Sequence, residues 1–220
     1  SHPRPVFDPA VAATPSFTIG SIGTLLFVAG FTGWLVLAPT FLTEVWDYSV
    51  FTAGFAIAPG PIAMAIAAGP AGKAAVRFGH GIVIAIGAVL ALLATIWWTI
   101  FVGAEPAYAT DLLPGLMLLG VGVGAGFPML TAATMSDVEP RRYAMGAAGS
   151  TTIRQLAMAI GIAIATAVVG APGETGSSVD PYATSWIICG VMFALTALTM
   201  GLPIHSESHA LSPKQAAHNG

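Results

Sequence analysis

Charged residues are scarce in this sequence: Asp, Glu, Lys and Arg together make up 8% of its 220 residues, against roughly 25% in soluble domains. Hydrophobic residues make up 55%, and the mean hydropathy is +0.82. Seven Lys and Arg stand against ten Asp and Glu, so the chain has no basic surface with which to bind nucleic acid through its phosphates. This composition indicates a polytopic membrane protein.

Cysteine is nearly absent too. The single Cys189 excludes an intrachain disulfide and a cysteine-based metal cluster. His205 and His209 stand four residues apart, but two histidines without further ligands do not make a metal site. No Ser/His/Asp set, pair of intramembrane carboxylates or HExxH spacing occurs. We therefore expect no enzyme activity, no metal and no cofactor.

Six apolar runs are long enough to cross a membrane. A bilayer core of about 30 Å needs roughly 20 residues of helix, and every backbone group in lipid must be satisfied within its own segment. The sequence therefore predicts an all-α protein with six transmembrane helices in one bundle. The predicted spans are residues 16–42, 51–72, 81–102, 112–135, 144–171 and 182–204.

Lys and Arg are confined to alternate segments between these runs. Alternate segments hold all Lys and Arg except Arg154, namely Arg4, Lys73, Arg77, Arg141, Arg142 and Lys214. The other segments hold only acids, namely Glu44, Asp47, Glu105, Asp111, Glu174 and Asp180. Basic loops stay in the cytoplasm. We therefore expect a multi-pass protein of the cell (inner) membrane with both termini cytoplasmic.

The two ends of the chain are polar. Residues 1–15 are rich in proline and too polar for a signal peptide, and the chain starts at Ser1. We interpret them as a cytoplasmic linker within a longer protein. Residues 205–220 lack periodicity and are expected to form a disordered cytoplasmic tail.

A glycine-rich run, Gly120, Gly122, Gly124 and Gly126, lies within the fourth span. No strand precedes it, which argues against a dinucleotide-binding turn. On a helix, glycines four residues apart let another helix approach closely. Pro128 follows and predicts a kink.

The first basic segment, residues 72–80, resembles a cytoplasmic loop motif of the major facilitator superfamily, Gly-x-x-x-Asp-Arg-x-Gly followed by basic residues. Gly72, Arg77 and Gly79 match the motif, whereas Val76 stands where the family has Asp. The resemblance implies that Arg77 helps to hold one face of a transporter closed. A plain loop that only sets topology is the alternative.

Further segments resemble the drug:proton antiporter branch of this superfamily, whose members have fourteen spans. They are residues 49–59, 119–128, 138–142, 146–149, 153–156 and Gly161. The resemblance covers about residues 16–204. It implies the C-terminal six-helix half of a transporter that exports lipophilic drugs by alternating access.

Arg154 is the one charge that does not lie clearly in a loop, which makes it a candidate for the substrate path. If its span starts at Ala144, Arg154 lies near the membrane midplane; if the span starts at Gln155, it reaches to the cytoplasmic surface. Ser150, Thr151 and Gln155 form a polar stripe with it at helical spacing. An interhelical hydrogen-bonding role is the alternative for this stripe. Trp34 is a further candidate for an apolar substrate cavity.

All ten acids fall in predicted loops or tails. If the whole protein exchanges protons, the coupling carboxylate is therefore expected in an absent N-terminal half. The expected partners are membrane lipid, that N-terminal half, a small lipophilic substrate and protons. Two alternatives stay open: a non-transporting remnant or membrane interaction subunit, and a carrier of the same superfamily for a different small metabolite.

Overall fold

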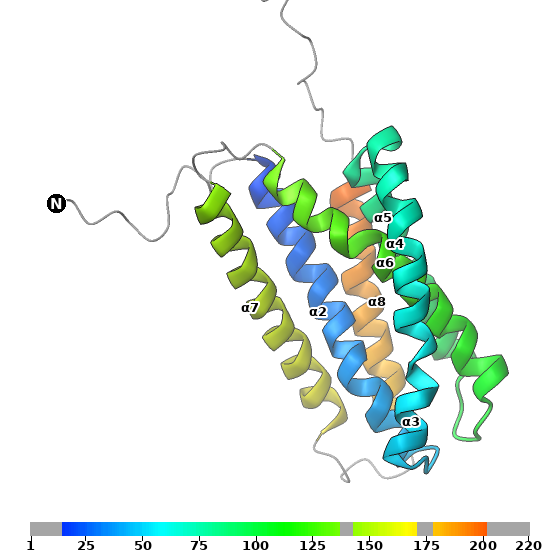
Figure 1. Ribbon diagram of the computed structural model, residues 1–220. Coiled ribbons are helices and arrows are strands. Elements are labelled where there is room, and N and C mark those ends of the chain that lie inside the picture. Colours follow the sequence, from blue (N-terminus) through cyan, green and yellow to red (C-terminus); the bar gives the residue numbers. More distant parts are fainter. Residues whose placement is uncertain (1–14, 137–142, 171–177, 202–220) are drawn as a thin grey trace, which may run out of the picture.

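The computed structural model describes residues 15–136, 143–170 and 178–201 (Figure 1). These residues form helices and no strand. The helices are α2 (Pro15–Glu44), α3 (Val50–Ile57), α4 (Pro59–Phe78), α5 (His80–Phe101), the π-helical turn η1 (Tyr108–Leu112), α6 (Leu113–Met135), α7 (Tyr143–Val169) and α8 (Asp180–Gly201).

Six helical segments in the described part of the chain are long and apolar enough to cross a membrane. They are Ser16–Glu44, Val50–Phe78, His80–Phe101, Tyr108–Met135, Tyr143–Val169 and Asp180–Gly201. The predicted fold class, an all-α six-helix membrane bundle, is confirmed. The predicted linker and tail, apart from Pro15 at the start of α2, lie outside the described residues, as do Arg141 and Arg142.

The second span consists of two helices. Ser49 caps the N-terminus of α3, and its Oγ accepts a hydrogen bond from the backbone N–H of Thr52 at 3.1 Å. Pro59 has no N–H to continue the hydrogen-bond ladder, so it fits the first position of a new helix. The span therefore divides into α3 and α4 at Ala58.

The segment predicted as a basic loop is mostly helical. α4 continues through Lys73 and Arg77 to Phe78, and Gly79 alone joins it to α5. Gly79 has φ +89°, a conformation that costs glycine little and other residues much. Ala and Lys are strong helix formers. The predicted apolar span ends at residue 72, whereas α4 continues to Phe78, because residues 73–78 also favour a helix.

The first three spans and the last three pack in the same pattern. α4 packs on α6 as α7 packs on α2, and α5 packs on α6 as α8 packs on α2. The symmetric pairs α2 with α6 and α5 with α8 complete the bundle. Since each set has three spans, the two sets run in opposite directions, which makes them an inverted repeat.

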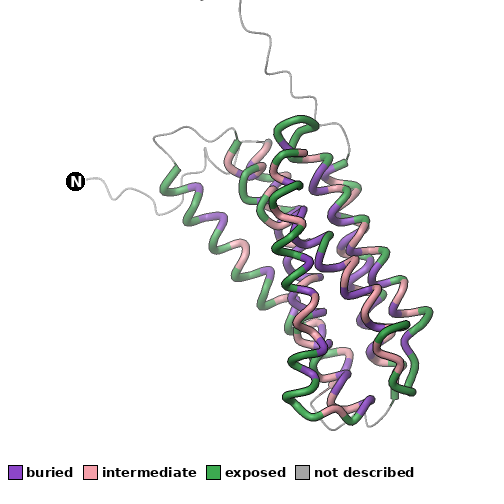
Figure 2. The backbone as a smooth tube through the Cα atoms, turned by 45° about the vertical axis from the view of Figure 1, so that its right-hand side comes forward, coloured by how far each residue is buried: buried purple, intermediate pink, exposed green. Residues whose placement is uncertain are grey.

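Burial is uneven among the spans (Figure 2). In an apolar stretch of 18 residues within the first span, 61% is buried. The corresponding share is 22% in the second span and 22% in the fifth. α4 and α7 therefore form two flanks of the bundle. Between them lies an aromatic core in which Phe41 contacts Trp46, Tyr182 and Trp186 edge-on at 5.2 to 5.4 Å.

Candidate functional site

The polar stripe lies on α7, one of the two exposed flanks. Ser150 is buried, Arg154 is half-buried, and Thr151 and Gln155 are exposed. The buried face of the same helix meets α2, where Gly161 lies against the backbone oxygen of Ala29. The stripe thus runs from the packed side of α7 toward its open side.

Arg154 lies eleven residues after Tyr143, the first residue of α7. At about 1.5 Å per residue this is a rise of about 16 Å, close to half of a 30 Å bilayer core. α7 has 27 residues, or about 40 Å of helix, and is longer than that core, so the start of the helix does not fix the depth of Arg154. No acidic side chain in the described part pairs with it. A guanidinium at the midplane would require water or a partner beside it.

Trp34 does not join this stripe. Its side chain is 4% exposed, and its ring stacks on Trp98 with centroids 5.1 Å apart and planes 13° apart. Both residues belong to the main buried hydrophobic cluster. Within this bundle, Trp34 contributes to packing between α2 and α5.

The glycines of α6 lie against three different helices. A Cβ on Gly120 would lie 2.5 Å from the Gly60 oxygen, and one on Gly124 would strike the backbone of Met64, both in α4. A Cβ on Gly122 would lie 2.5 Å from the Gly87 oxygen in α5, and one on Gly126 would meet the ring of Phe27 in α2. α6 therefore packs closely on α2, α4 and α5 at the same time. Only glycine, which has no Cβ, permits these short distances.

Pro128 also lies inside α6. It has no N–H to donate to the Gly124 carbonyl, so the helix lacks one hydrogen bond directly after the glycines.

The basic-segment residues are separate from the stripe. Gly72 has open space around it, and the Arg77 guanidinium lies 5.2 Å from the Phe78 ring centroid. Val76, which replaces the motif's Asp, is 90% exposed, so position 76 offers Arg77 no carboxylate.

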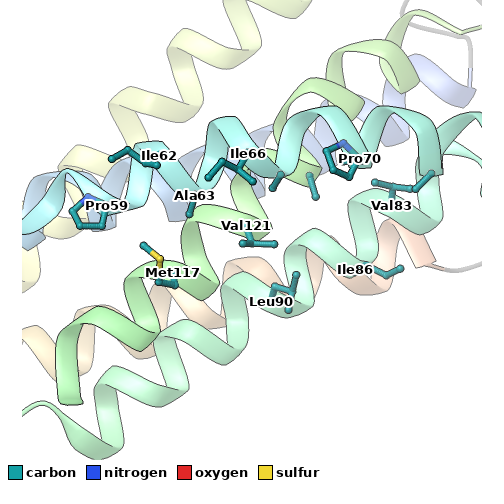
Figure 3. A pocket seen from close by; sticks show the side chains of 14 residues that line it. Pro59, Ile62, Ala63, Ile66, Pro70, Val83, Ile86, Leu90, Met117 and Val121 are labelled. Carbon is teal, nitrogen blue, oxygen red and sulfur yellow. The ribbon is translucent and has the colours of Figure 1, made fainter. Parts of the chain in front are cut away.

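An apolar groove that the sequence patterns had not predicted lies between α4 and α5, with α6 as its floor (Figure 3). Its volume is about 690 Å³. The signal was present in the sequence: Pro59, Ile62, Ala63, Ile66 and Pro70 recur at helical spacing on one face of α4.

A bundle of six apolar spans, arranged as an inverted repeat around a glycine-rich central helix, defines a polytopic membrane protein of the transporter type. Residues 20–219 match the Major Facilitator Superfamily. The chain belongs to this superfamily, whose members are transporters rather than enzymes.

Similar proteins carry names that refer to drug resistance or export. The chain is 24% identical over 184 residues to the lincomycin resistance protein LmrB of Listeria innocua, covering 81% of this chain and 38% of LmrB. It is 27% identical over 163 residues to the multidrug export protein EmrB of Escherichia coli K12, covering 74% and 32%. An uncharacterized transporter of the superfamily, YhcA of Bacillus subtilis, is 26% identical over 168 residues, covering 76% and 31%. The chain thus matches less than two fifths of each relative's length.

Proposed function

We propose that this chain is the C-terminal half of a secondary active transporter that exports small lipophilic compounds in exchange for protons. The observation that carries the proposal is the superfamily match over residues 20–219, together with relatives named for lincomycin resistance and multidrug export. Six spans supply one wall of a midplane cavity, and alternating access requires a second wall that rocks against it.

The exposed flanks support a missing N-terminal half as the partner. The second and fifth spans occupy equivalent positions in the inverted repeat. Only 22% of the apolar stretch of each is buried. The polar stripe with Arg154 and Gln155 lies on one of these flanks. A second six-helix half seated across both flanks would enclose Arg154 in a cavity rather than in lipid, which lowers the cost of its charge.

Proton coupling then depends on the partner half. Arg154 is the sole charged side chain well inside a described span, and an arginine does not release its proton in proteins. The coupling group is therefore a carboxylate contributed by the N-terminal half. The chain by itself is expected to insert in the membrane without carrying out transport.

Transport is tested with purified protein in vesicles under an imposed pH gradient, with a fluorescent lipophilic cation as substrate. The chain together with an N-terminal half should move the dye, and the chain alone should not. Gradient-driven transport by the chain alone would contradict the half-transporter proposal. Failure of the pair in spite of normal assembly would favour an interaction subunit.

Arg154 is tested in the assembled transporter. Arg154→Ala should lower dye efflux at least tenfold with normal expression, and Arg154→Lys should restore only part, since a point charge does not replace a planar guanidinium. Thr152→Ala is the matched control on the same helix, because its hydroxyl is bonded to the Ala148 oxygen at 3.0 Å. Normal efflux by Arg154→Ala would assign Arg154 to anchoring at the membrane surface.

The orientation is proposed to place the end with Lys73 and Arg77 in the cytoplasm. Val76→Cys and Ala104→Cys, each in a Cys189→Ala background, place single thiols at opposite exposed ends of the bundle. An impermeant thiol reagent added to intact cells should label position 104 and not position 76. The reverse pattern would overturn the orientation.

A further inference from the structure

The apolar groove between α4 and α5 continues along most of the membrane-spanning length of α4. Its lining on α4 extends from Pro59 to Ala74, fifteen residues or about 22 Å of helix. One leaflet of the hydrocarbon core is about 15 Å deep. The groove is therefore long enough to hold an extended chain through a whole leaflet.

The lining contains no polar residue type. α4 contributes only Pro, Ile and Ala to the lining, α5 only Val, Ile and Leu, and α6 only Met, Val and Ala. A substrate that needs orientation would require polar groups in such a site. A purely apolar lining instead fits hydrocarbon, for which no hydrogen bond has to be made.

One end of the groove carries positive charge. Lys73 lies three residues after Pro70, and Arg77 lies three residues after Ala74. Residues three apart share a helix face, so both basic side chains continue the lining face of α4. Both side chains are exposed. No acid in the described part of the chain pairs with either one. His80, at the start of α5, stands three residues before the lining residue Val83.

The equivalent place in the other repeat is closed. The space between α7 and α8 over α2 has a volume of only about 10 Å³. α2 and α7 also meet closely there, with Gly33 near the Gly161 oxygen. The open groove is thus a property of one repeat, and it is the repeat whose helix ends carry Lys73 and Arg77.

We propose that this groove binds one acyl chain of an anionic phospholipid, whose phosphate lies between Lys73 and Arg77. The acyl chain accounts for the apolar lining and its length, and the negative headgroup accounts for the unpaired positive charges at one end. This binding does not depend on transport. It requires that a partner half seated on the α4 flank leaves the side of α4 that faces α5 open to lipid. Lipid labelling does not measure transport, so its failure can be told apart from a failure of the proposed function.

The test uses the intact protein that contains this chain, reconstituted in phosphatidylcholine vesicles with a small fraction of a photoreactive lipid. The lipid carries a diazirine within one acyl chain, on either a phosphatidylglycerol or a phosphatidylcholine headgroup. After illumination, labelled peptides are mapped by mass spectrometry. The phosphatidylglycerol probe should label the groove-lining residues of α4 and α5 at least fivefold more than the phosphatidylcholine probe, since each basic side chain near the membrane surface contributes about fivefold.

Two variants of α4 form a matched pair. Ala67 lines the groove, whereas Ala65 is exposed on another face of the same helix. Ala67→Trp should remove most groove labelling, and Ala65→Trp should leave it unchanged. The double variant Lys73→Gln with Arg77→Gln should reduce phosphatidylglycerol labelling to the phosphatidylcholine level, while Lys73→Arg with Arg77→Lys should retain it.

Three results would overturn the proposal. Equal labelling by both probes would show that the headgroup is not recognised. Unchanged labelling in Ala67→Trp would place the chain elsewhere. Crosslinks between groove residues and another protein helix, with no lipid adduct in the wild type, would show that a helix occupies the groove.

Discussion

The two ends of the bundle are held together in different ways. At the end that carries the acids, Trp and Tyr side chains donate hydrogen bonds to groups in other segments. Trp46 donates to the Gly103 oxygen at 2.9 Å, Trp98 to the Leu112 oxygen at 3.1 Å and Tyr108 to the Ala56 oxygen at 2.9 Å. Tyr182 donates to a Glu44 carboxylate oxygen at 3.1 Å. Three of these bonds join residues at least 52 positions apart in the sequence, and the Trp98 bond joins α5 to the start of the next span.

At the basic end, small residues make the contacts. A Cβ on Gly20 would lie 2.6 Å from the Thr134 hydroxyl oxygen, and one on Gly81 would lie 3.0 Å from the Met200 oxygen. Buried hydroxyl oxygens without a hydrogen-bond partner also lie near this end, on Ser16, Ser21 and Thr24 of α2. None of the Trp and Tyr bonds described above lies here.

The difference shows two ways of fixing helices in a membrane. Directional hydrogen bonds fix the register and rotation of the helices at the acidic end. Close packing of glycine and small side chains fixes only their separation at the basic end. Four substitutions test this contrast, each measured as the thermal unfolding midpoint of the purified protein in detergent.

Gly20→Leu should have the largest effect. Its side chain would collide with Thr134, including its Cα at 2.9 Å, so α2 and α6 would have to separate. The expected cost is about 3 kcal/mol or more, seen as a large fall in the midpoint or a loss of folded protein. Gly69→Leu is the control, because nothing lies within 4 Å of that position. Equal loss in both variants would mean that packing at Gly20 is not special.

Trp98→Phe should come next. The indole is fully buried, stacks on Trp34 and donates to the Leu112 oxygen. Loss of the bond and of part of the stack should cost about 1–3 kcal/mol. Trp97→Phe removes a similar bond, to the Asp111 oxygen at 2.9 Å, but its ring is only half-buried. The Trp97 variant should therefore lose less, and the reverse order would argue against the buried stack as the stabilising feature.

Tyr108→Phe should have a smaller effect. It removes one hydrogen bond, from a half-buried hydroxyl to the Ala56 oxygen, and leaves the ring in place. Interhelical hydrogen bonds in membrane proteins average about 0.6 kcal/mol. Tyr143→Phe at the basic end is the control, since Tyr143 is exposed. A similar midpoint for the two variants would remove Tyr108 from the set of stabilising bonds.

Thr24→Val should have the smallest effect and the opposite sign. Because the buried hydroxyl has no partner, a methyl group of the same shape should leave stability unchanged or raise it. Thr134→Val is the control, because that buried hydroxyl donates to the Leu130 oxygen at 2.7 Å. A clear loss in Thr24→Val alone would reveal a partner for this hydroxyl in the assembled protein.

Much of the architecture was predictable from one-dimensional patterns. The number of spans and the all-α class follow from apolar length, because lipid satisfies no backbone hydrogen bond. The substitution of Val76 for the motif's Asp was also visible. The division of the second span at Pro59 was missed, although the proline itself signals it.

The site was less predictable. Trp34 and Trp98 are 64 residues apart in the sequence, and nothing local indicates that their rings stack. Hydropathy alone allowed two starts for the fifth span, and α7 begins at Tyr143, eleven residues before Arg154. The glycine spacing predicted close approach, but the identity of each neighbouring helix is a property of the folded bundle.

The sequence by itself determined six membrane-spanning segments, with Lys and Arg other than Arg154 confined to alternate loops and tails, because the cost of burying charge and backbone in lipid acts on each segment separately. Only the tertiary structure decided which faces of those segments are covered. It opened a groove on α4 and closed its counterpart on α7, and it placed Trp34 in the core. The physical reason is that close packing depends on pairs of surfaces, and the two members of each pair come from distant parts of the chain.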